Sequence, residues 1–186
     1  MSTDAVVAFS RAISRLRLDR ALGLHELEIC FASGTTPKGL TGRFRGRLLA
    51  MSVGHGFDWP AEAATQLWKP WLGKTFDNST GTGRNEFTRG AGRLMRLTLP
   101  RYPDLREEGP GRSSAFVFRT STGPSALDSG VTVLRIDYRN VPENPSWPIR
   151  RVLDELVTID DGLYLGQALL EWRGALRRAA WFSLER

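Results

Sequence analysis

The sequence predicts an all-β protein: a closed antiparallel β-barrel of about eight or nine strands, with an N-terminal helix and one short helix. After residue 40, short runs with apolar residues at alternate positions are separated by turn residues such as glycine and proline. The length of 186 residues suits one barrel that encloses a single small ligand. We therefore expect a single domain over 1–186, with a helix over 1–23 and the barrel over 40–186.

The first element is an amphipathic helix. Val7, Ile13 and Leu16 recur close to the 3.6-residue period, and arginines lie largely on the opposite face. Gly23 suits the residue that ends the helix, because glycine enters the left-handed region without steric cost. A basic helix of this kind can lie on a membrane surface, but we favour packing over the end of the barrel.

Residues 41–52 predict the first strand, because Phe44 and Leu48 share one face while three arginines lie on the other. The short helix is expected over 60–67, with Pro60 at its first position, where proline is well tolerated. This strand should therefore have one face in the barrel interior and one in solvent.

The rest of the chain consists mostly of further strand candidates. They span residues 72–77, 85–89, 93–99, 114–121, 131–139, 153–160, 163–172 and 175–184. Gly162 follows two aspartates between two of these runs and supplies the positive φ that a tight hairpin needs. Gly174 suits a further hairpin, so we expect an antiparallel meander at the C-terminal end of the chain.

Two short motifs carry a family resemblance. Residues 42–46 read Gly-Arg-Phe-Arg-Gly, and residues 71–76 read Trp-Leu-Gly-Lys-Thr-Phe. Together they resemble the opening of the calycin superfamily, especially lipocalin-like bacterial proteins with a Gly-X-Trp-X-Gly element and a later Trp-X-Gly-Lys-X-Phe element. Phe44 stands where that family has tryptophan. The resemblance covers about 39–76, and it implies a closed antiparallel barrel that holds an apolar small molecule such as a lipid.

Charge and cysteine content bear on partners and compartment. The net charge is +6, but the chain has only three lysines and its arginines are scattered without a polybasic run, so we expect no nucleic-acid partner. The single cysteine, Cys30, excludes an internal disulfide and agrees with a reducing compartment. The sequence shows no secretory signal and no transmembrane segment, so a cytoplasmic protein is expected.

Metal and nucleophile chemistry have little support in the sequence. With two histidines and one cysteine, we expect no metal site, because zinc or iron sites need three or four ligands. Haem needs only one axial histidine, so a haem-binding barrel with His55 remains an alternative. Cys30 lies in the apolar run 27–32, where a buried and inert thiol is the favoured interpretation.

The expected ligand pocket is the barrel interior. Aromatic and apolar residues on the inward faces of the strands should form its wall, and a glutamine in an otherwise apolar row should contact ligand or water. The candidate ligand-binding residues are Phe44, Trp71, Phe76, Phe116, Phe118, Tyr138, Leu165 and Gln167. Because both faces of 163–172 are apolar, the outer one needs cover, either from the N-terminal helix or from a second subunit in a homodimer.

The strand that contains Tyr138 allows two orientations. Alternation puts Tyr138 on one face and Arg135, Asp137 and Arg139 on the other. If the charged face points outward, the arginines form surface ion pairs with Asp137, and Tyr138 lies in the interior. If it points inward, Arg135 or Arg139 becomes an anion-binding group for a carboxylate. We favour the outward orientation, because unpaired charges in a barrel interior are costly.

These features indicate a protein that binds a hydrophobic or amphipathic small molecule. The alternative is a cofactor-free barrel enzyme, a cyclase or isomerase of an apolar metabolite, with Tyr138 as proton donor and Asp137 or Glu155 as base. Adjacent residues of a strand point to opposite faces, so a pair of Asp137 with Tyr138 would need a bulge. Glu155 is geometrically freer to meet Tyr138.

Overall fold

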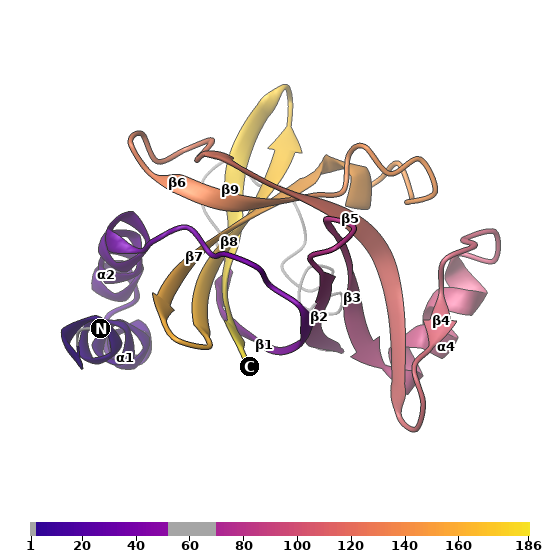
Figure 1. Ribbon diagram of the computed structural model, residues 1–186, viewed down its shortest axis with the longest axis horizontal. Coiled ribbons are helices and arrows are strands. Elements are labelled where there is room, and N and C mark those ends of the chain that lie inside the picture. Colours follow the sequence, from indigo (N-terminus) through magenta and orange to yellow (C-terminus); the bar gives the residue numbers. More distant parts are fainter. Residues whose placement is uncertain (1–2, 52–69) are drawn as a thin grey trace.

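The computed structural model describes residues 3–51 and 70–186. Within them, eight strands form a closed antiparallel barrel (Figure 1). A ninth short strand, β4 (Arg106–Glu107), pairs with Ser113 and Ser114 near the start of β5. The barrel strands are β1 (Gly42–Met51), β2 (Trp71–Asp77), β3 (Thr82–Thr88), β5 (Arg112–Pro124), β6 (Thr132–Asp137), β7 (Val152–Asp160), β8 (Leu163–Trp172) and β9 (Ala175–Glu185). Each pairs with the next, β3 with β5, and β9 returns to β1, so the predicted fold class is confirmed.

The N-terminal region contains two helices, α1 (Thr3–Leu18) and α2 (Arg20–Ser33), where the sequence analysis expected one helix ending at Gly23. Asp19 separates them, because its side chain caps α2 by accepting a hydrogen bond from the Leu22 amide at 3.1 Å. Gly23 lies inside α2, where a Cβ would come within 2.4 Å of the Leu16 backbone nitrogen. This glycine therefore permits the close approach of two helices and does not end one.

The two helices pack against the side of the barrel, beside β7 and β8 in Figure 1, and not over its end as expected. Phe31 of α2 meets Trp181 of β9 edge to face, with ring centroids 5.5 Å apart. Leu165 of β8 and Val157 of β7 lie in the same buried cluster. The helices thus supply the cover that the apolar outer face of β8 was expected to need, whereas a second subunit stays a prediction.

A further helix among the described residues, α4 (Arg89–Thr98), occupies most of the segment 93–99 that the sequence analysis expected as a strand. Thr88 caps it by accepting a hydrogen bond from the Ala91 amide at 3.4 Å, and Met95 is buried against the barrel. The short helix expected over 60–67 lies outside the described residues. A single turn, η1 (Ile149–Arg151), precedes β7, and none of the described helices is long and apolar enough to cross a membrane.

Two glycines of the motif residues let β1 and β2 approach each other closely. A Cβ on Gly46 would lie 2.4 Å from the Trp71 ring, and one on Gly73 would lie 2.0 Å from the Phe44 carbonyl oxygen. Gly73 has a φ of +141° and sits where a bulge shifts the β2–β3 register. Because of this bulge, Trp71 and Lys74 both face the barrel interior although they are three residues apart.

Candidate functional site

The barrel interior contains a partly open cavity of about 110 Å³. Most of its wall is apolar and comes from strands β2, β3, β5, β7 and β8 and from η1. The apolar lining residues include Trp71, Phe87, Phe116, Ile149, Val152, Ala168 and Leu170. For scale, an apolar cavity of about 150 Å³ holds a benzene molecule. The cavity can therefore accommodate a small apolar group or the end of a longer chain.

Four polar side chains converge on this cavity, and we call them the polar cluster: Lys74, Asn85, Tyr138 and Asp154. They come from β2, β3, the residue after β6, and β7, so the closure of the barrel brings them together. Each is at most 6% exposed. Buried polar groups in an otherwise apolar pocket are the usual means by which a protein orients a ligand.

Lys74 is the centre of the polar cluster. Its Nζ donates hydrogen bonds to Tyr138 Oη at 2.6 Å, to Asn85 Oδ1 at 2.8 Å and to Asp154 Oδ2 at 2.8 Å. These three bonds use all three protons of an ammonium group. The contact with Asp154 is also a salt bridge in which both side chains are almost completely buried.

Asn85 connects the ammonium group to the cavity wall. Its Oδ1 accepts from Lys74 and from Trp71 Nε1, the latter at 3.1 Å. Its amide group donates to Tyr138 Oη at 2.9 Å and to the Phe116 carbonyl at 3.2 Å. Two accepted and two donated bonds exhaust the capacity of an asparagine side chain, so its orientation is set by the protein itself.

Asp154 is the member of the polar cluster with unused hydrogen-bonding capacity. Its Oδ2 accepts from Lys74 and, at 3.1 Å, from Tyr138, whose hydroxyl already accepts from Lys74 and Asn85. Its Oδ1 is buried, and no donor from the described residues reaches it. A buried carboxylate oxygen without a partner is unfavourable. Asp154 Oδ1 is therefore the acceptor of the polar cluster that lacks a hydrogen-bond donor.

The surroundings shift two pKa values in the polar cluster. Burial lowers the pKa of Lys74, while the charge of Asp154 and its hydrogen bond act in the opposite direction. Burial and the charge of Asp154 raise the pKa of Tyr138 well above its ordinary value, against the hydrogen bond from Asn85. Tyr138 is therefore a neutral phenol at physiological pH and remains able to donate a proton or a hydrogen bond.

The cavity wall contains a strained residue. Phe116 has a φ of +56°, which is unusual for a residue with a bulky side chain, and it sits where the β3–β5 register shifts. Tyr102 Oη accepts a hydrogen bond from the Phe116 amide at 2.6 Å, and Asn85 donates to its carbonyl at 3.2 Å. Such strain persists only where the surroundings impose it, and it clusters at functional sites.

Three of the eight predicted ligand-binding residues, Trp71, Phe116 and Tyr138, line the cavity. Phe44, Phe76 and Phe118 also face the barrel interior, but they pack against one another and not along the cavity wall. Their ring centroids are 5.3–5.5 Å apart, from Phe44 to Phe76 and from Phe76 to Phe118. These rings fill the closed part of the barrel.

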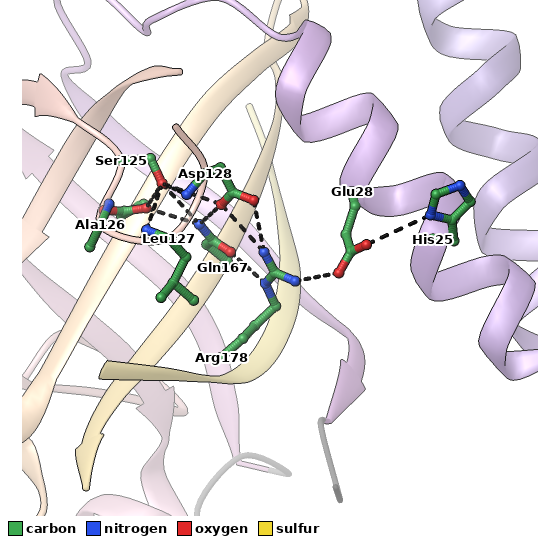
Figure 2. Close-up of polar contacts among 9 residues, drawn as sticks. His25, Glu28, Ser125, Ala126, Leu127, Asp128, Gln167 and Arg178 are labelled. Carbon is green, nitrogen blue, oxygen red and sulfur yellow. Dashed lines mark hydrogen bonds and ion pairs between the residues drawn. The ribbon is translucent and has the colours of Figure 1, made fainter. Parts of the chain in front are cut away.

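The other two predicted ligand-binding residues, Leu165 and Gln167, lie on the outer face of β8, which corrects the expectation that they face the interior. Figure 2 shows Gln167 beside the 125–128 loop, close to Asp128 and Arg178. The Gln167 amide nitrogen donates to Asp128 Oδ2 at 2.7 Å, and its oxygen accepts from Arg178 Nε at 2.5 Å. Alternation predicted which residues share a face of β8 with Gln167 but not whether that face points inward. The hydrogen bonds of the Gln167 amide are made to Asp128 and Arg178 of the protein itself.

Glu155 belongs to the same outer network and is therefore not a partner of Tyr138. Its carboxylate accepts from the Ala126 amide at 2.7 Å and from Gln167 at 2.9 Å. The adjacent residue of β7, Asp154, faces inward and meets Tyr138 instead. The β7 carboxylate that contacts Tyr138 is therefore that of Asp154 and not that of Glu155.

The charged face of the Tyr138 strand points outward, as favoured. Arg139 pairs with Asp137 at 2.8 Å, and Arg135 donates to the Pro124 carbonyl. Burial raises the pKa of Asp137, but hydrogen bonds and charge from Arg139 outweigh this effect and hold the pKa below its ordinary value. Neither arginine lines the cavity, and Asp137 lies on the opposite face of the strand from the Tyr138 side chain.

The remaining candidates lie away from the cavity or outside the described residues. Cys30 is 6% exposed, and burial together with the charge of Glu26 raises the pKa of its thiol, which disfavours the thiolate. In the described part of the chain, no three histidine, cysteine or acidic residues are arranged to hold a metal ion. His55, the proposed haem ligand, lies outside the described residues.

Comparisons with known proteins support the fold but do not identify a function. No protein-family model matches the chain, and no curated protein matches its sequence. Among solved structures, the chain is similar to a protein from Thermomonospora curvata, with 17% identity and a TM-score of 0.52 over 96% of this chain and 97% of that one. This likeness supports the barrel fold, whereas the resemblance to the calycin superfamily stays a prediction.

Proposed function

We propose that the chain binds a small, predominantly apolar molecule in the barrel cavity, with one end of the ligand against the polar cluster. The observation that carries this proposal is an apolar cavity on which four buried polar side chains converge. Pockets that bind small molecules have this composition: mostly apolar walls and a few placed polar groups.

A structural role explains the polar cluster less well. A buried ion pair is weak support for stability, because its desolvation cost offsets most of the attraction between the charges. Lys74 and Asp154 lie beside a cavity and not in a filled core, and the strained Phe116 lies on the same wall. The buried ion pair, the unfilled cavity and the strained Phe116 each cost stability. Ligand binding explains their occurrence at one place better than packing does.

Two measurements test the proposal. Native mass spectrometry of freshly purified protein should detect a retained small molecule, and its absorption spectrum would reveal haem. Calorimetric titration with alcohols, ketones and hydrocarbons of about four to eight carbon atoms, the size range that the cavity suggests, should detect binding to emptied protein. Absence of both a retained molecule and any binding in this series would reject the proposal.

Arg135→Ala and Arg139→Ala should each leave the affinity for both acidic and neutral ligands within about twofold of the unaltered protein. Both arginines lie on the outer face of the barrel, and the half-buried pair of Arg139 with Asp137 contributes about 1 kcal/mol to stability. Titration of a carboxylic acid and its matching alcohol against each variant checks this. A selective loss of acid binding would restore the anion-binding interpretation.

A second candidate function is a cofactor-free enzyme, such as a cyclase or isomerase of an apolar metabolite. The contact that favours it is Tyr138 Oη to Asp154 Oδ2 at 3.1 Å, which places a proton donor and a carboxylate together at the cavity. Cyclisation and isomerisation return every proton that they take, so Tyr138 and Asp154 would suffice as acid and base. This pair replaces the pairs with Asp137 or Glu155 that the sequence suggested.

Tyr138→Phe distinguishes the two functions. If Tyr138 only shapes the cavity and bonds within the polar cluster, the affinity should change by no more than about tenfold, because one hydrogen bond contributes roughly 0.5–1.5 kcal/mol. If Tyr138 transfers a proton, turnover of a converted metabolite should fall by about 10² or more. Unchanged turnover in the variant would reject the enzymatic role of this residue.

A further inference from the structure

The hydrogen-bonding capacity of the polar cluster is almost completely used within the protein. Lys74 donates three bonds, Asn85 donates two and accepts two, and Tyr138 donates one and accepts two. None of these three side chains has a donor or acceptor left for a ligand without breaking an existing bond. The remaining capacity lies on Asp154.

The unused atom is Asp154 Oδ1, on a side chain that is 2% exposed. Asp154 lines the cavity, and the partner of Oδ1 is absent from all described residues. An ionised carboxylate oxygen accepts hydrogen bonds and donates none. Because Asp154 is part of the cavity wall, a ligand donor brought against this wall would supply the partner that Oδ1 lacks.

We propose that the ligand carries a neutral hydrogen-bond donor, a hydroxyl or N–H group, which binds Asp154 Oδ1 while its hydrocarbon part fills the apolar cavity. This inference rests on the proposed function and names the chemical class of its ligand. The volume of about 110 Å³ limits the buried part of the ligand to a small ring or a short chain.

Charge balance excludes the two charged classes. Lys74 and Asp154 already neutralise each other at 2.8 Å, so any charged group in the cavity would be buried without a counterion of its own. A carboxylate would face Asp154 Oδ1 directly and find every Lys74 proton in use. An ammonium ion would compete with Lys74 for the same carboxylate and leave one of the two cations unpaired.

The test compares ligands that share a carbon skeleton and differ in one group. Cyclopentanol, cyclopentanone, cyclopentanecarboxylate and cyclopentylamine are titrated into the unaltered protein by calorimetry, and 2-butanol and 2-butanone repeat the comparison on a chain. Each alcohol should bind about ten- to hundredfold more tightly than its ketone, which cannot donate to Oδ1. The carboxylate and the amine should bind more weakly than the alcohol.

Two variants assign any preference to Asp154. Asp154→Asn keeps the shape of the side chain but offers an amide, so the preference for alcohol over ketone should fall to within about threefold. Asp137→Asn, on the outer face, should keep the full preference. The comparison in the unaltered protein decides the question even if Asp154→Asn fails to fold.

The outcomes separate the two proposals. If a ketone, carboxylate or amine binds as tightly as its alcohol, or more tightly, the donor class is wrong and the cavity still binds small apolar molecules. If none of the six compounds binds and no retained molecule is found, the proposed function fails, and the donor class fails with it. An alcohol preference that persists in Asp154→Asn would also overturn the role of Asp154.

Discussion

Replacing Lys74 with methionine is expected to lower the free energy of unfolding by about 3–5 kcal/mol, because the Asp154 carboxylate then stays buried without its counterion. Lys74 is 2% exposed, so water does not compensate the loss. Tyr138 and Asn85 also lose a hydrogen-bond donor at 2.6 and 2.8 Å. A change of this size is a large fraction of the typical stability of a domain, which is about 5–15 kcal/mol.

Chemical denaturation of the variant against the unaltered protein measures this effect, and two further variants interpret it. Lys74→Met combined with Asp154→Leu removes both charges and should recover most of the stability, because an apolar pair can replace a buried ion pair at little cost. Lys38→Met, at an exposed lysine, should be nearly neutral. Loss of less than about 1 kcal/mol in Lys74→Met would show that Asp154 does not depend on Lys74.

Recovery in the double variant would also bear on function. If apolar residues support the fold as well as the ion pair does, the charges are not required for folding. The double variant should then retain the barrel and lose the preference for donor ligands, since Asp154 Oδ1 is gone. Stability and binding can thus be separated at the same two positions.

Strand prediction succeeded where side chains alternate clearly. In β1, Phe44 is 1% exposed while the three arginines at alternate positions face solvent, as the pattern indicated. The 153–160 and 163–172 runs also match β7 and β8 closely, because Gly162 marks the turn between them. Local pattern and turn chemistry carry this information without knowledge of the tertiary structure.

The helices were harder to predict because their boundaries depend on tertiary contacts. Met95 of α4 is buried against the barrel, but Leu94 and Leu97 are 61% and 79% exposed, so burial in this helix does not follow its apolar positions. The seven residues 93–99 are also too few for a helical period to be distinguished from a strand. Similarly, Gly23 looks like a helix end, but its close approach to Leu16 is visible only after α1 and α2 pack together.

The polar cluster was not predicted, and the reasons are specific. Asp154 and Glu155 lie between two leucines, so alternation gives each face of β7 one leucine and one carboxylate and cannot distinguish inside from outside. Lys74 shares a face with Phe76, which was placed in the pocket wall, and this was the available signal. A lysine is rarely buried without a partner, and its partners lie 11, 64 and 80 residues away in sequence.

Replacing Ala168 with leucine is expected to weaken ligand binding roughly fiftyfold. Ala168 lines the cavity on β8 and pairs across the sheet with Asp154 of β7, so a larger side chain would project into the cavity beside Asp154. Leucine adds three carbon atoms and displaces about as many ligand carbons. At roughly 0.8 kcal/mol for each buried CH₂ group, the loss is about 2.4 kcal/mol.

The fold should tolerate this substitution better than an ordinary core position would, because the added atoms enter existing space and not a filled core. Denaturation should place Ala168→Leu within about 1 kcal/mol of the unaltered protein, while calorimetry shows the loss of cyclopentanol binding. Ala175→Leu, at an exposed position of β9, serves as the control and should bind normally. Normal binding by a stably folded Ala168→Leu variant would place the ligand outside the barrel cavity, and the polar cluster would then need another explanation.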